Sequence, residues 1–147
     1  MSAKQDFIDQ IKSQGAILLP ASTDRAIVLA QNALQGMRSA IIPTDFIDLF
    51  HNDCGGIILG DSEIFGPEEH DRPGSSYSMP SIIQINREIN GLPGMRGRTV
   101  FGRNGLFWFC FDAFGYCYML DILNLNPMRK YQDSWRAMLD CLAVGKI

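Results

Sequence analysis

One segment near the C-terminal end constrains the fold more than any other part of the chain. Asn104-Gly105 separates two runs rich in β-forming residues, 98–103 and 106–112. Asn-Gly favours a type I′ hairpin turn, because both central residues of that turn need positive φ. A third run, 116–122, follows after a link that contains Gly115, so the pattern predicts a three-stranded antiparallel meander. Its middle strand is apolar on both faces, and we expect it to lie inside the sheet, covered on both sides.

The other apolar residues predict helices and short strands around this meander. Ser2 with Gln5 predicts a capping box for the first helix, and Ser22 or Thr23 can cap the second. Pro43 is expected at the first position of the third helix, where a missing N–H costs nothing. Helices are expected over residues 3–14, 26–35, from 43 to the glycine pair at 55–56, 80–90 and 133–144, and strands over 57–59 and 61–66.

Two segments lack clear helix or strand periodicity. We interpret residues 17–20 as a short apolar connector and residues 67–78, which are polar and turn-rich, as one long loop. Helices, a strand pair, one helix, the meander and a last helix follow one another, without the alternation that is typical of parallel α/β proteins. The sequence therefore predicts a single α+β domain over residues 1–147, with a mixed or antiparallel sheet packed by four to five helices.

The charge and hydropathy of the sequence disfavour two classes of protein, those that bind nucleic acid directly and those that span a membrane. Thirteen Lys and Arg against sixteen Asp and Glu give a net charge of −3, which disfavours direct, sequence-independent binding of nucleic acid. No apolar run approaches the roughly 20 residues of a membrane span. Residues 1–6 also lack the order of a signal peptide, so we expect a cytoplasmic protein without a membrane partner.

The four cysteines are scattered along the chain and form no Cys-x-x-Cys motif. We interpret Cys54, Cys110, Cys117 and Cys141 as reduced, mostly buried thiols. Cys110 and Cys117 can lie opposite each other in the meander, depending on the register of the strands. A disulfide between them is possible on geometry, but a pair of core thiols is the favoured interpretation in a reducing compartment.

The two histidines are the remaining candidates for chemistry. His51 has Asp53 and Cys54 nearby, but a histidine stabilised by the dipole at a helix end is the favoured interpretation. His70 stands in an acidic stretch that offers four adjacent oxygen or nitrogen ligands to a cation. Adjacent loop residues rarely converge on one ion, so a solvated loop is favoured. We therefore predict no catalytic residue, no metal site and no cofactor, and a protein that is not an enzyme.

Charged residues are unevenly distributed between two segments. Residues 61–71 contain five acids and no Lys or Arg, whereas residues 87–103 contain four arginines and one acid. An acidic surface can steer a basic partner such as a nuclease, the arginines can bind an acidic partner, or both segments are simply solvated. The predicted partner-binding residues are Asp61, Glu63, Glu68, Glu69 and Asp71, and the arginines are Arg87, Arg96, Arg98 and Arg103.

Several segments match the pattern of one known family. Residues 42–50, Ile-Pro-Thr-Asp-Phe-Ile-Asp-Leu-Phe, match a helix start of the form Leu/Ile-Pro-x-(Asp/Glu)-(Tyr/Phe). The glycine pair at 55–56, the strand end at 64–66, the late strands within 100–121 and Ser-Trp-Arg-Ala-Met-Leu at 134–139 follow in the same order. Together they resemble the SUKH superfamily, which includes bacterial immunity proteins and the fungal cell-wall-synthesis regulators of the Smi–Knr group.

The resemblance covers most of the chain and rests on packing and turn residues. It implies a SUKH-like domain with its core at about residues 22–145, preceded by the helix 3–14. The implied function is a non-enzymatic binding module that neutralises a cognate toxin by occlusion, with contacts through residues 61–71 and the exposed meander loops. An intracellular regulatory or scaffolding protein of the same fold is the alternative, and a small ligand-binding domain or enzyme comes third. The residues expected to be structural are Pro43, Gly55, Gly56, Gly66, Asn104, Gly105 and Gly115.

Overall fold

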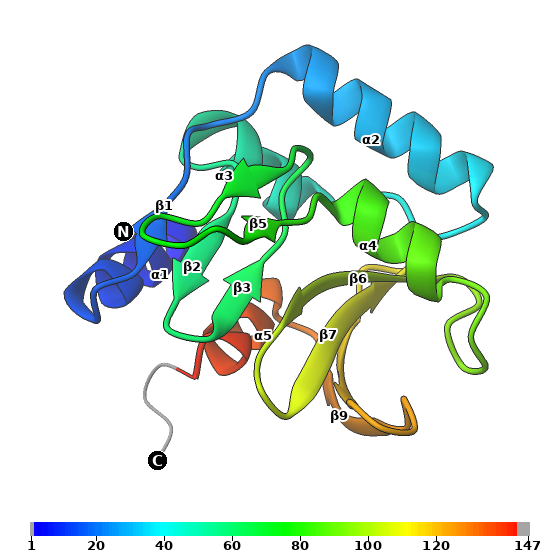
Figure 1. Cartoon of the computed structure of the whole chain (residues 1–147). Coiled ribbons are helices and arrows are strands. Elements are labelled where there is room, and N and C mark those ends of the chain that lie inside the picture. Colours follow the sequence, from blue (N-terminus) through cyan, green and yellow to red (C-terminus); the bar gives the residue numbers. More distant parts are fainter. Residues whose placement is uncertain (1, 144–147) are drawn as a thin grey trace.

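The computed structural model describes residues 2–143, which form five helices and two antiparallel sheets (Figure 1). The larger sheet has seven strands in the order β1-β2-β3-β6-β7-β8-β9, and β4 pairs with β5 in a second sheet. The predicted α+β class is confirmed. The helices are α1 (Ala3–Ser13), α2 (Asp24–Gly36), α3 (Thr44–Asn52), α4 (Ile82–Ile89) and α5 (Ser134–Cys141). The strands are β1 (Ile17–Leu18), β2 (Ile57–Leu59), β3 (Ser62–Ile64), β4 (His70–Asp71), β5 (Ser78–Met79), β6 (Arg98–Arg103), β7 (Phe107–Asp112), β8 (Cys117–Asp121) and β9 (Pro127–Tyr131).

The predicted meander is present as β6, β7 and β8, with β7 inside the sheet. The prediction of a type I′ turn between β6 and β7, however, is wrong. Neither Asn104 nor Gly105 has positive φ. Instead the Asn104 side chain oxygen accepts hydrogen bonds from the backbone N–H groups of Leu106 and Phe107, both at 2.9 Å. Asparagine therefore makes the turn through its side chain, and the link has three residues where two were expected.

Two strands at the edges of the sheet were not expected. The segment interpreted as a connector contains β1, which pairs with β2 through Ile17↔Ile58 and Leu18↔Ile57. At the opposite edge β9 extends the meander to a fourth strand. Four of its five residues are exposed, so β9 lacks the alternation of apolar and polar residues that identifies a strand from sequence.

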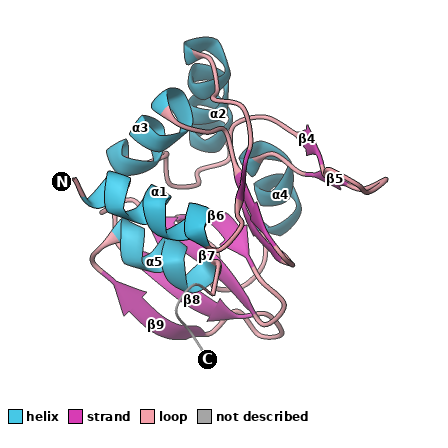
Figure 2. Ribbon diagram, turned by 90° about the vertical axis from the view of Figure 1, so that its left-hand side faces the viewer, coloured by secondary structure: helices cyan, strands magenta, loops and turns pink. Residues whose placement is uncertain are grey.

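The predicted long loop is also partly wrong, because residues 67–78 include most of a small hairpin. His70 pairs with Met79 and Asp71 pairs with Ser78. Figure 2 shows that this β4–β5 hairpin projects away from the main sheet. Met79 is fully buried, so the base of the hairpin belongs to the core while its turn extends into solvent.

The helices follow the expected positions, with different capping at three of them. Ser2 accepts from the backbone of Gln5, but the Gln5 side chain donates to Asp9, so only half of the predicted capping box forms. Thr23 caps α2. Pro43 is the N-cap of α3, one position before the first helical residue. The predicted fourth helix begins at Ile82 behind a complete capping box of Ser81 and Gln84, and the predicted end of the last helix, Val144, lies outside the described residues.

Helices cover the sheet through aromatic contacts. Phe46 of α3 lies 4.8 Å from Phe101 of β6 and 5.2 Å from Phe111 of β7, measured between ring centroids. In Figure 2, α1 and α5 lie side by side over the sheet, where Phe7 packs on Trp135 with ring centroids 5.4 Å apart. All but Trp135 are buried, so these contacts join three helices to the sheet in one core.

A buried asparagine completes the hydrogen bonding of the central strand β6. Strand β3 pairs with β6 only at Arg103 and Gly102, which leaves the backbone of Val100 without a strand partner on that side. Asn86 of α4 is fully buried and exchanges two hydrogen bonds with Val100, accepting from its N–H at 2.8 Å and donating to its carbonyl at 2.9 Å. Its side chain therefore replaces the missing strand, as buried backbone groups require.

Two glycines of the family-like pattern lie where segments cross at very short range. A Cβ on Gly66 would sit 1.7 Å from the carbonyl oxygen of Gly55, and a Cβ on Gly55 would sit 2.4 Å from the carbonyl oxygen of Pro20. Backbone cannot yield there as a flexible side chain could, so only glycine fits. Gly105 is different, because a Cβ there meets nothing within 4 Å and its φ is not positive. The structural requirement expected at Gly105 is therefore absent.

Candidate functional site

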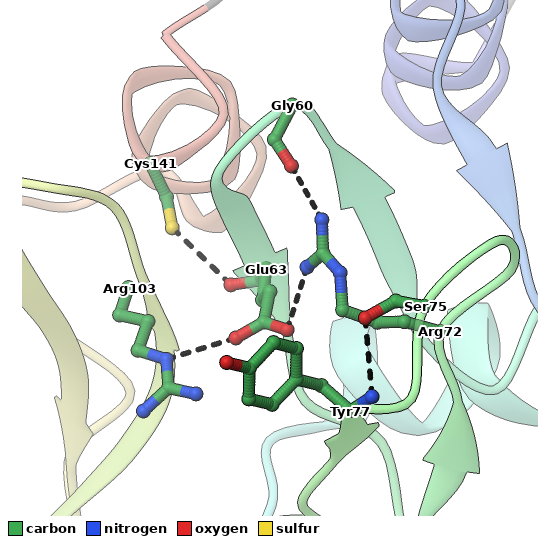
Figure 3. Close-up of polar contacts among 7 residues, drawn as sticks. All are labelled: Gly60, Glu63, Arg72, Ser75, Tyr77, Arg103 and Cys141. Carbon is green, nitrogen blue, oxygen red and sulfur yellow. Dashed lines mark hydrogen bonds and ion pairs between the residues drawn. The ribbon is translucent and has the colours of Figure 1, made fainter.

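The five predicted partner-binding acids fall into two groups, and Glu63 stands apart. Its side chain is only 6% exposed and its carboxylate binds two arginines, as Figure 3 shows. Arg72 donates from Nη1 to Oε2 at 2.8 Å, and Arg103 donates from Nε to Oε1 at 2.8 Å. A carboxylate bound in this way cannot reach a partner. The expectation that Glu63 contributes to the contact surface is wrong.

Glu63 instead anchors the β4–β5 hairpin to the main sheet. Arg72 directly follows β4, and its second nitrogen, Nη2, donates to the carbonyl of Gly60 at 2.7 Å (Figure 3). Arg72 also donates its backbone N–H to the carbonyl of Tyr77 across the hairpin at 3.0 Å. One side chain therefore ties the projecting hairpin to the β2–β3 turn and to the buried carboxylate. Partly buried, charge-assisted contacts of this kind hold a loop in one position better than exposed ion pairs do.

The other four acids are Asp61 in the β2–β3 turn and Glu68, Glu69 and Asp71 at the start of the hairpin, and we refer to them together as the acidic surface. All four are exposed, and within residues 2–143 none lies within 4.0 Å of a cationic side chain nitrogen. Glu69 accepts from Gln84 at 3.3 Å and Asp71 accepts from Ser78 at 3.2 Å, which orients these two carboxylates without neutralising them. Tyr77, on the same hairpin, is 75% exposed. The hairpin thus presents uncompensated negative charge beside an exposed aromatic ring.

The histidines do not form a reactive pair. His51 lies in the last turn of α3, as expected, and its Nε2 is 2.9 Å from Asp24 at the start of α2. His70 does not lie in a solvated loop, because it belongs to β4 and its Nε2 is buried without a hydrogen-bond partner. In the described part of the chain, no group of three or more His, Cys, Asp or Glu side chains is placed to hold a metal ion.

The four cysteines are free and buried. Cys110 pairs with Tyr118, and Cys117 pairs with Phe111, so the two thiols are one position out of register and point to opposite faces of the sheet. The predicted possibility of a disulfide between them is therefore excluded by the strand register. Burial raises the pKa of the Cys54, Cys110 and Cys117 thiols to about 12. Burial also raises the pKa of Cys141, so all four thiols stay protonated and unreactive near neutral pH.

The arginine-rich segment does not act as one free cationic surface. Arg103 is bound by Glu63 and lies 5.6 Å from the ring centroid of Trp108. Arg98 donates to the carbonyl of Gly94 and lies 4.7 Å from the ring centroid of Tyr118. These two guanidinium groups therefore serve local packing, whereas Arg87 and Arg96 are exposed.

A concave site lies beside the acidic surface, and we call it the end groove. Its volume is about 730 Å³, which is within the usual range of ligand sites. One acid of the acidic surface, Asp61, lines it, together with the Asn104 turn of the meander and the C-terminal end of α5. No local sequence pattern indicates the groove, because its walls come from three segments that are far apart in the chain. The lining residues are Leu59, Asp61, Ser62, Asn104, Gly105, Leu106, Phe107, Arg136, Asp140, Leu142 and Ala143.

Three comparisons with known proteins find no match to this chain. No protein-family model, no curated protein and no solved structure matches the chain. Within residues 2–143, none of the helices is both long enough and apolar enough to cross a membrane.

Proposed function

We propose that this chain is a SUKH-type protein-binding module that neutralises a cognate toxin domain by occlusion. The observation that carries the proposal is the projecting β4–β5 hairpin, which presents exposed, unpaired carboxylates and is tied to the core through Arg72 and the buried Glu63. A rigid projection of one charge suits insertion into a concave site of the opposite charge. It also costs little ordering entropy on binding, because the hairpin is already fixed.

The charge of the acidic surface favours a basic partner such as a nuclease domain. Nucleases bind phosphates through basic residues, and carboxylates can occupy the same electrostatic environment. Complementary charge raises the association rate and its dependence on salt more than it raises the final affinity. In the proposed mechanism the hairpin blocks access to the toxin's basic cleft, and no turnover is required.

The free thiols support a cytoplasmic location for this activity. Four buried cysteines without a disulfide are typical of a reducing compartment. An immunity protein that acts before secretion of its toxin would work in that compartment. Reversible, rapid association also suits a protein that must meet each new copy of the toxin.

The proposal expects a neighbouring reading frame to encode a toxin-like domain, and the test is whether the purified chain binds that domain. Association and dissociation rates would be measured by surface plasmon resonance with the wild-type chain and with a variant carrying Glu68→Lys, Glu69→Lys and Asp71→Lys, at low and at physiological salt. We expect tight binding by the wild type and an association rate that falls roughly 10–100-fold in the variant. Asp9→Lys is the matched control, since Asp9 is exposed on α1, away from the hairpin, and its substitution should leave binding unchanged.

Three results would count against the proposal. No complex with the neighbouring domain would favour a regulatory or scaffolding protein of the same fold. Equal effects of the hairpin variant and of Asp9→Lys would remove the role given to the acidic surface. Turnover of a substrate by the purified chain would replace occlusion by catalysis.

A further inference from the structure

The end groove has walls of mixed polarity and opens at one end of the meander. Leu59, Phe107 and Leu142 supply apolar surface from the end of β2, from the start of β7 and from the residue that follows α5. Leu106 also lines the groove, although 68% of its surface is exposed. A large apolar side chain held in a turn at such exposure gains little from folding. It is suited to gain from contact with another apolar group.

Further exposed apolar residues lie at the same end of the sheet. Strand β7 begins and strand β8 ends at the Phe107↔Asp121 pair, and Leu106 and the 38% exposed Ile122 are the chain neighbours of that pair. Leu123 follows and is 90% exposed. The groove and the turn after β8 therefore share one apolar end of the molecule.

The charges on the two walls of the groove are not equivalent. On the helix wall Asp140 is already satisfied, because it accepts from the Tyr131 hydroxyl at 2.6 Å and from Arg129 at 2.9 Å. Arg136 lies 3.5 Å from the same carboxylate. On the turn wall Asp61 is exposed and, within residues 2–143, has no ion-pair partner. Asp61 is thus the unpaired carboxylate of the groove, whereas the helix wall carries one positive charge in excess, because Arg129 and Arg136 share the single carboxylate of Asp140.

We infer that the end groove receives an apolar side chain of the protein partner together with a neighbouring Lys or Arg that pairs with Asp61. The apolar side chains of the walls, the volume and the unpaired carboxylate of Asp61 together fit such an apolar–basic segment. The inference rests on the proposed function, since Asp61 belongs to both the acidic surface and the groove. The hairpin then steers the partner, while the groove supplies the buried anchor that typically dominates the energy of an interface.

The test uses NMR titration of the full-length, isotope-labelled chain with two matched peptides. The probes are acetyl-Lys-Leu-Phe-Lys-amide and acetyl-Glu-Leu-Phe-Glu-amide, which differ only in the sign of their charge. We expect the lysine peptide to give saturating shifts at the amides of Asp61, Gly105 and Leu106, with a Kd on the order of 1 mM. The glutamate peptide should bind at least about fivefold more weakly, because it meets the Asp61 carboxylate.

Three variants separate the groove from its surroundings. Leu106→Asp should abolish the shifts, and its exposure makes the fold tolerant of the change. Asp61→Asn should remove the preference for the lysine peptide while keeping residual binding of both. Leu29→Asp is the matched control, since Leu29 is 54% exposed on α2 and does not line the groove, and it should leave both titrations unchanged.

Each remaining outcome has a defined meaning. Absent shifts, shifts confined to other surfaces or equal binding of the two peptides would overturn the inference. A concentration-dependent dimer that Leu106→Asp abolishes would show that a second copy of the chain fills the groove, and would overturn it as well. Discrimination between the peptides without any toxin complex would keep the groove and reject the proposed function. A toxin complex whose affinity Leu106→Asp does not change would reject the groove and keep the function.

Discussion

Replacing the buried Glu63 by glutamine tests the anchoring of the hairpin. Glutamine has nearly the same shape as glutamate, so the substitution changes charge and hydrogen bonding while it leaves packing intact. The carboxylate now accepts from Arg72 at one oxygen and from Arg103 at the other, both at 2.8 Å. In the Glu63→Gln variant one of these oxygens becomes an NH₂ group, so one arginine faces a donor where it had an acceptor.

The structure sets the expected size of this effect. The Glu63 side chain is 6% exposed, so water cannot replace the lost contact, and the side chains of Arg72 and Arg103 are only 24% and 34% exposed. Breaking a buried ion pair by removing one partner costs roughly 3–5 kcal/mol. Because the amide oxygen still serves one arginine and both arginines reach solvent in part, we expect about 3 kcal/mol. For a chain of this length that corresponds to a fall of about 6–12 °C in melting temperature.

Urea unfolding followed by circular dichroism measures this free energy directly. The midpoint should shift while the slope against urea stays constant, because the fold is retained. Glu69→Gln is the matched control, since Glu69 is exposed and makes one contact of 3.3 Å, and it should stay within about 0.5 kcal/mol of the wild type. A Glu63→Gln variant as stable as the control would refute the anchoring role. So would unchanged hydrogen exchange at the Arg72 amide, which donates to Tyr77 across the hairpin.

Three further predictions concern the core. Gly66→Ala should prevent folding or lower the free energy of unfolding by more than about 4 kcal/mol. Gly105→Ala should change the same free energy by less than about 0.5 kcal/mol, and thermal denaturation of the two variants measures the difference. Asn86→Leu leaves both backbone groups of Val100 unpaired in the core and should cost about 2–5 kcal/mol, measured by urea unfolding with the exposed Asn32→Leu as control. The thiols of Cys54, Cys110 and Cys117 have a pKa of about 12 when folded against 9.0 for the free side chain, so the native state keeps protons that the unfolded chain releases. Stability should therefore fall as the pH rises above about 9, and Ellman's reagent should label the thiols only after unfolding; rapid labelling of the native chain at pH 8 would contradict this.

The parts of the fold that sequence predicted are those with a strong local pattern. Strands β6 to β8 are apolar and separated by turn residues, and the Ser2 and Thr23 caps follow from residue type. Strand β9 was missed because four of its residues face solvent at the sheet edge. Asn104 was recognised as a turn residue, but its mechanism was wrong, because its side chain replaced the positive φ that Asn-Gly usually supplies.

The candidate site was predicted less well because it depends on contacts distant in sequence. From the sequence alone Glu63 does not differ from the exposed acids around it. Its partners Arg72 and Arg103 lie nine and forty residues away in the chain. The hairpin was not predicted, because its Pro, Gly and Ser residues also occur in unstructured loops. The end groove combines the β2–β3 turn, the Asn104 turn and the end of α5, and no local pattern can show that these meet.

Hydrogen–deuterium exchange, measured on the chain alone and with the toxin-like domain that the proposal expects in a neighbouring reading frame, tests whether the anchored acidic hairpin binds the partner. We expect slowed exchange at the backbone amides of residues 68–78 in the complex, and little change on the outer side of α1. Slowed exchange confined to α1 or α2, with the hairpin unaffected, would contradict the claim that the anchored acidic hairpin is the surface that binds the partner.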